Sequence, residues 1–85
     1  MDRWLYIRHA AVIDKIIEIG PDTPFTSGSV ELEKTRGHVL VDLKNHGSVT
    51  WTGRQKKTNT NIYKVSRHQY NQMKKIQEQF KNATS

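Results

Sequence analysis

The C-terminal part of the chain carries the strongest folding signal, because a helix start precedes a regular apolar stripe. Ser66 and Gln69 have the spacing of a capping box, in which the two side chains bind free amides of the first helical turn. Beyond the box, apolar residues follow at steps of three and four and predict one helical face: Tyr70, Met73, Ile76 and Phe80. We expect an amphipathic helix from about Arg67 to Lys81 that closes the core with its apolar face.

The length and composition limit how much core the rest of the chain can build. With 85 residues, of which 34% are hydrophobic and 26% charged, we expect a single domain over residues 1–85 with a small core. The absence of cysteine excludes disulfides and thiolate metal sites. No run approaches the roughly 20 apolar residues of a membrane helix, and Arg8 and His9 interrupt the apolar stretch near the N-terminus. We therefore expect a cytoplasmic protein.

The middle of the chain alternates apolar and polar residues, which is typical of antiparallel strands. Residues 30–33 and 39–44 show this alternation, with a glycine-containing turn at 35–37 between them and another at 45–47. Residues 48–52 and 61–65 are rich in β-branched and aromatic types and predict two further strands. The polar, basic segment 53–60 between them is expected to be an exposed loop.

The N-terminal segment, residues 3–19, admits two interpretations. As a helix ending at Gly20-Pro21, it lines one side with apolar residues: Leu5, Val12, Ile13, Ile16 and Ile17. As a strand, it places residues 11, 13, 17 and 19 on one face together with Lys15. The density of β-branched residues from Val12 to Ile19 favours the strand, because such side chains lose rotamer freedom in a helix.

These elements predict an α+β fold. The expected architecture is a small antiparallel sheet of about four to five short strands, open or curled into a partial barrel, packed on the C-terminal amphipathic helix. If residues 3–19 are helical, the alternative order is α-β-β-β-α.

Charge is distributed very unevenly along the chain. Up to Asp42, five basic residues face seven acidic ones, whereas from Leu43 onward nine basic residues face Glu78 alone. A one-sided positive field attracts polyanions, and nucleic acid is the commonest such partner. We expect a small nucleic-acid-binding regulatory or accessory protein, DNA or RNA being left open. A protein partner on the acidic N-terminal half, and a monomer or homodimer, are further expectations.

The alternative function is a protein–protein interaction module, an inhibitor or adaptor, that docks its basic surface on an acidic protein partner. Both functions use the same surface, so charge alone does not separate them. Salt-dependent binding to oligonucleotides would do so.

The candidate binding site lies in and after the loop at 53–60. Basic side chains beside two aromatic residues are the combination with which single-strand binders hold phosphates and stack bases. Trp51 and Tyr63 bracket the loop, although each is also a candidate core residue. The basic face of the C-terminal helix offers a second surface. The expected nucleic-acid-binding residues are Trp51, Arg54, Lys56, Lys57, Tyr63, Lys64, Arg67, Lys74 and Lys81.

Other chemistry finds little support in the sequence. The four histidines, His9, His38, His46 and His68, lack metal-ligand spacing, and the glycines do not form a phosphate loop. The pair Glu31 and Glu33 is explained by an exposed strand face. We expect no cofactor, no metal and no enzymatic activity. If the protein were an enzyme, a small nuclease would be the class to consider.

Overall fold

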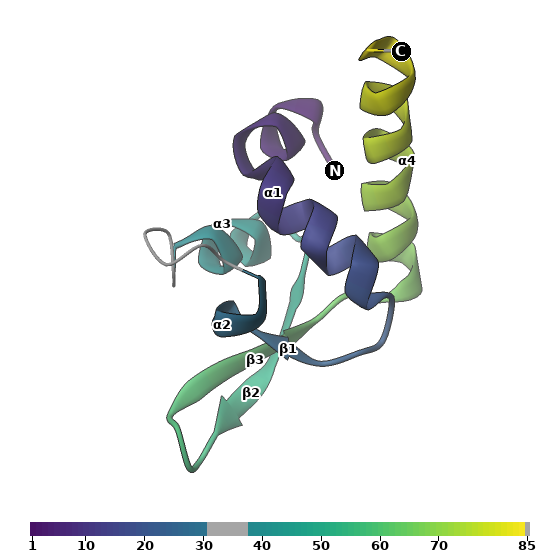
Figure 1. Cartoon of the computed structure of the whole chain (residues 1–85). Coiled ribbons are helices and arrows are strands. Elements are labelled where there is room, and N and C mark those ends of the chain that lie inside the picture. The colour runs from purple at the N-terminus through teal and green to yellow at the C-terminus, as the bar shows by residue number, and fades with distance from the viewer. Residues whose placement is uncertain (31–37, 85) are drawn as a thin grey trace.

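The structure, a computed structural model, describes residues 1–30 and 38–84. Within these ranges the chain forms a small α+β domain with four helices and three short antiparallel strands (Figure 1). No described helix is both long and apolar enough to cross a membrane. In chain order the elements are α1 (Arg3–Ile19), β1 (Phe25–Thr26), α2 (Ser27–Val30), α3 (Val39–Asn45), β2 (Thr50–Gln55), β3 (Thr60–Lys64) and α4 (Arg67–Thr84).

The sheet is open and has the order β1-β3-β2. Central strand β3 pairs with both neighbours, so that Tyr63 lies opposite Phe25 on one side and opposite Trp51 on the other. The register shifts between Trp51 and Gly53, and Gly53 has φ of 143°, a backbone conformation that favours glycine at such a bulge. The hairpin turns at residues 56–59, where Asn59 has φ of 55°.

The preference for a strand at residues 3–19 is wrong, because this segment is helix α1. Its six buried residues recur at helical spacing: Leu5, Tyr6, Val12, Ile13, Ile16 and Ile17. A strand would have turned half of them to solvent. Burial of this face outweighs the weak intrinsic preference of valine and isoleucine for strands. The helix ends as the helical interpretation predicted: Gly20 has φ of 93° and its N–H donates to the carbonyl of Ile16.

The strands expected in the middle of the chain are also corrected. Residues 39–44 lie in α3, and Val30 ends α2, whereas residues 31–37, with the rest of the first expected strand and its turn, lie outside the described residues. In α3 the buried residues are Val39, Leu40 and Leu43, and Val41 is 42% exposed. The α+β class is confirmed. The described sheet has three strands, fewer than the four to five expected, and it is open rather than curled into a partial barrel.

The expected strands on either side of the basic loop are confirmed with shifted ends. β2 starts at Thr50 and runs to Gln55, and β3 starts at Thr60. Half of the loop expected over residues 53–60 is therefore strand, and only residues 56–59 form the turn.

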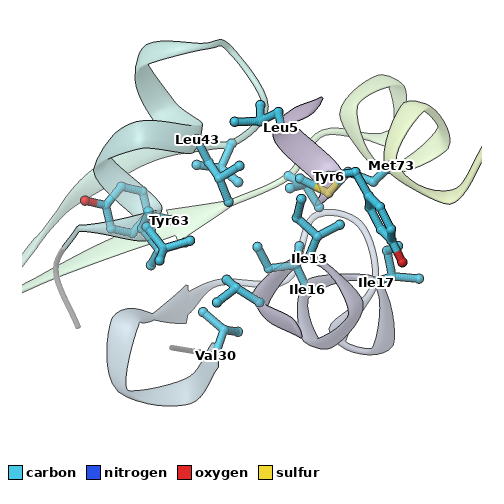
Figure 2. Close-up of a cluster of buried hydrophobic side chains, with 14 of the residues drawn as sticks. Leu5, Tyr6, Ile13, Ile16, Ile17, Val30, Leu43, Tyr63 and Met73 are labelled. Carbon is cyan, nitrogen blue, oxygen red and sulfur yellow. The ribbon is translucent and has the colours of Figure 1, made fainter. Parts of the chain in front are cut away.

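The core is one cluster to which every described element except β2 contributes a buried residue (Figure 2). α1 supplies the largest share, and it packs against α2, α3 and α4. Ile13 and Ile16 are completely buried, as are Leu40 and Leu43 of α3 and Met73 of α4. The sheet joins this core at its base through the stacked rings of Phe25 and Tyr63, whose centroids are 6.5 Å apart.

The C-terminal helix begins at the predicted capping box. The Ser66 N–H donates to Gln69 Oε1 over 2.9 Å, and the Gln69 N–H donates to Ser66 Oγ over 3.2 Å. Met73 and Ile76 are buried, whereas Tyr70 and Phe80 are half-buried against the cluster. The helix was expected to pack on the sheet. Its main packing partner is α1, where Phe80 stacks on Tyr6 with 5.3 Å between ring centroids.

A polar network crosses the interface between α1 and α4. The Tyr6 hydroxyl donates to Asp14 Oδ1 over 2.7 Å, and buried Gln77 donates to the same oxygen over 2.8 Å. Burial raises the pKa of Tyr6 to about 12, and the hydrogen bond to Asp14 and the charge of that carboxylate add to the shift. The network therefore favours the protonated phenol.

Truncating Met73 tests the role of α4 in the core. Because Met73 is completely buried, Met73→Ala should lower the free energy of unfolding by about 2–5 kcal/mol in urea denaturation. The exposed neighbour Lys75 is the control, and Lys75→Ala should change stability by about 0.5 kcal/mol or less. Equal effects of the two substitutions would contradict the packing of α4 on α1.

The Tyr6 network predicts a loss of stability in alkali. A phenol whose pKa rises on folding stabilises the fold fully below the unfolded value of 10, and this stabilisation disappears as pH rises toward 12. A shift of this size corresponds to about 2–3 kcal/mol. Urea unfolding at pH 8 to 12 should show this decline, and Tyr6→Phe should flatten it. Tyr70→Phe is the control, since no described residue hydrogen-bonds its hydroxyl. An identical decline in Tyr6→Phe would contradict the assignment.

Candidate nucleic-acid interface

The β2–β3 hairpin projects beyond the helices and carries only positive charge (Figure 1). Residues 50–64 contain four basic residues and no acidic one. Arg54, Lys56 and Lys57 are exposed at or near the tip, and Lys64 is half-exposed at the base. The structure therefore places the four basic site residues predicted in this segment on a hairpin that projects from the body of the protein.

Part of the hairpin surface is organised by Asn61. Its Oδ1 accepts a hydrogen bond from Trp51 Nε1 at 3.2 Å and one from Arg54 Nε at 3.5 Å. Arg54 also donates to Asn59 Oδ1 over 3.2 Å. These bonds hold the guanidinium along the β2–β3 hairpin, where its remaining N–H groups can reach an anion. Trp51 is 49% exposed, so part of its indole surface stays accessible.

Tyr63 does not belong to this surface. It is 4% exposed and lies in the core (Figure 2). Its ring stacks on that of Phe25, so it cannot offer the ring to a base. The prediction that Tyr63 stacks bases is therefore wrong. Its place opposite Phe25 depends on a strand pairing between residues 38 positions apart in the sequence, which local patterning does not show.

The predicted residues on α4 lie apart from the hairpin tip. Arg67 begins the helix and is exposed, and α4 then leads away from the hairpin (Figure 1). Lys74 is exposed and its Nζ lies 6.0 Å from the centre of the Tyr70 ring, while Lys81 is exposed near the far end. Lys74 and Lys81 thus form a second basic surface, distinct from the hairpin.

Helix α3 presents a polar surface that the sequence pattern did not indicate. Val41, Lys44 and Asn45 are exposed, whereas the opposite side of the helix is buried. The assignment of residues 39–44 to a strand hid this face. The spacing of Leu40 and Leu43, three residues apart, was the available helical signal, but a run of this length fits both patterns.

Two histidines that are far apart in the sequence meet the same carboxylate where α1 crosses α3. His9 Nε2 lies 2.7 Å from Asp42 Oδ2, and His46 Nδ1 lies 2.8 Å from the Asp42 carbonyl and 3.5 Å from Oδ1. The edge of Trp4 packs against His46 with 5.1 Å between ring centroids. His9 itself has non-helical backbone angles and marks a kink in α1. The fold thus brings His9 and His46 to one aspartate, although their spacing in the sequence did not indicate a shared site.

The electrostatics at this junction stabilise the ionised aspartate. The hydrogen bond from His9 lowers the pKa of Asp42, partial burial opposes it, and the charges of His46, His9 and Arg8 lower it further. In the described parts of the chain, no group of three or more histidine, aspartate or glutamate side chains could hold a metal ion. Glu31 and Glu33 lie outside the described residues.

The lowered pKa of Asp42 predicts an acid-sensitive contribution to stability. An aspartate of this kind stabilises the fold above its unfolded pKa of 3.8, and the contribution is lost as pH falls below that value. The unfolding free energy should therefore fall between pH 5 and pH 2, and Asp42→Asn should reduce the fall. Asp22→Asn, at an exposed loop position, should leave it unchanged. Parallel pH profiles for the parent and Asp42→Asn would refute the role of this contact.

Comparison with known proteins identifies no relative of this chain. No family model, no curated protein and no solved structure matches the chain.

Proposed function

We propose that this protein binds double-stranded nucleic acid with the β2–β3 hairpin and the exposed face of α3. The projecting hairpin carries the proposal: it exposes Arg54, Lys56 and Lys57, and it contains no acidic residue that would neutralise them. Lys64 and Arg67 extend the same charge toward the base of the hairpin. Phosphate contacts from such side chains release counterions and supply affinity independent of sequence.

The internal contacts of two acidic side chains support the proposal that the basic hairpin binds nucleic acid. Asp14 is hydrogen-bonded within the α1–α4 interface, and Asp42 is bound to His9. These two carboxylates from the acidic half of the chain are therefore occupied by internal contacts. The basic side chains at the hairpin tip are different, since Lys56 and Lys57 make no hydrogen bond or ion pair with any described residue.

The geometry favours a duplex over a single strand. Because Tyr63 is buried, Trp51 is the one exposed aromatic residue on the described hairpin. One ring is too few to stack the successive bases of a single strand. A helix or a two-stranded ribbon, in contrast, fits the major groove of B-form DNA. α3 is such a helix and the β2–β3 hairpin such a ribbon, so DNA is the duplex that the proposal names.

On this proposal the protein is a regulatory or accessory factor of the cytoplasm, without catalytic activity of its own. The exposed Lys44 of α3 reaches base edges, and the hairpin holds the adjoining backbone. Docking of the same basic surface on an acidic protein is the competing function, and the binding experiment separates the two.

The hairpin variant Arg54→Ala/Lys56→Ala/Lys57→Ala is the direct test. Fluorescence anisotropy on random 20-bp DNA, at several salt concentrations, should show weaker binding for every duplex sequence. The slope of log affinity against log salt should shrink by about 0.9 for each phosphate that the variant no longer neutralises. Duplex RNA and single-stranded DNA, measured in parallel, should bind more weakly to the parent protein.

A control variant with the same change in net charge removes cations that lie off the hairpin, namely Arg3→Ala/Lys15→Ala/Lys75→Ala. It should keep most of the parent affinity, provided that circular dichroism shows both variants folded. An equal decrease in affinity for the two triple variants would mean that net charge alone drives binding. A parent protein without salt-dependent duplex binding would overturn the proposal and favour an acidic protein partner.

A further inference from the structure

A surface pocket of about 550 Å³ lies where α1 crosses α3. α1 lines it with Arg8 and His9, and the stretch that leads into α3 and the helix itself supply the rest: His38, Val39, Val41, Asp42 and Asn45. No hairpin residue lines it. We propose that this pocket binds a sugar–phosphate unit of the duplex backbone and so forms a second contact, beside α3 and separate from the hairpin. The proposal rests on the proposed function.

The pocket holds hydrogen-bond donors that no described residue engages. The Arg8 guanidinium makes no hydrogen bond or ion pair with any described residue, and neither do the side chains of His38 and Asn45. Arginine stays charged and presents its N–H groups in a fork that matches phosphate oxygens. The imidazole of His38 and the side-chain amide of Asn45 add N–H donors on the α3 side. Donors from α1 and from the α3 side can therefore face the same anion.

Among the described residues that line the pocket, Asp42 is the one that would oppose an anion, and its carboxylate is engaged by internal contacts. Its carboxylate is bound by His9 at 2.7 Å and lies 3.5 Å from His46. Arg8 also contributes to the field that lowers the pKa of Asp42, so the guanidinium lies close enough to offset that charge. The carboxylate is thus held by two histidines, and Arg8 contributes positive charge to the same pocket.

The apolar part of the lining explains why the pocket is larger than a phosphate needs. Val41 is 42% exposed, and it lines the pocket together with Val39, which is largely buried. Carbon atoms of a sugar ring can cover these methyl groups while the phosphate meets the donors. The volume lies within the range of sites that hold small organic groups.

The test compares Arg8→Ala with Lys15→Ala, which removes an equal charge from α1 outside the pocket. Arg8→Ala should weaken binding to random 20-bp DNA by about tenfold and lower the salt slope by about 0.9. Lys15→Ala should change affinity by about twofold or less. If the two variants bind alike while the hairpin variant fails to bind, the pocket proposal is wrong and the proposed function stands. Failure of the parent protein to bind any duplex removes both.

A measurement on the parent protein covers the case in which Arg8→Ala does not fold. In NMR titration with the same duplex, the Arg8 Nε–H, the His38 ring and the Asn45 side-chain amide should shift together with the hairpin signals. Chemical-shift changes confined to the hairpin would overturn the proposal that the pocket binds the duplex backbone. Titration with inorganic phosphate distinguishes the source of the anion: pocket shifts with free phosphate and none with duplex would make it a site for small anions instead.

Discussion

The apolar face of α1 is the contact on which the rest of the structure depends. Three other helices pack against it, and its residues Ile13 and Ile16 are completely buried. In a chain of 85 residues no second core can compensate, because the buried area is small and stability is the narrow difference of large opposing terms. The Tyr6–Asp14–Gln77 bonds then orient α4 on this face without leaving a buried polar atom unpaired in the described chain. α1 thereby positions α3 and the pocket beside it, whereas the hairpin is held through β1 and Gln69 of α4.

The base of the sheet packs on the core, whereas the tip of its hairpin is exposed to solvent. At the base, Tyr63 and Phe25 tie β3 and β1 to the core, and Gln69 of α4 binds Thr50 and the Gly47 carbonyl. Toward the tip the strands carry polar and basic side chains, and their cross-strand bonds converge on Asn61. A hairpin anchored at one end and solvated at the other can project from a small body without weakening the core. This arrangement frees its cations for an external anion.

The junction of α1 and α3 joins structural and proposed functional roles. The contacts of Asp42 with His9 and His46 hold α3 against the kink of α1, and the same contacts set the charge of the pocket beside them. On the proposal of an anion site, these contacts link the position of α3 to the pocket. The hairpin lacks such a coupling, since its basic residues are exposed and the hydrogen bonds near its tip stay within β2, β3 and their turn.

The local sequence determined the elements whose signals are local. The capping box and stripe of α4, the glycine stop of α1 and the basic turn between two strands all depend on residues a few positions apart. Tertiary structure decided the rest. Residues 3–19 and 39–45 are helices because their apolar faces pack on partners distant in sequence, and burial there exceeds the small energetic scale of β-propensity. The same holds for the candidate site: its cations could be predicted from composition, whereas the burial of Tyr63, the exposure of Trp51 and the meeting of Arg8 with α3 arise only from long-range packing.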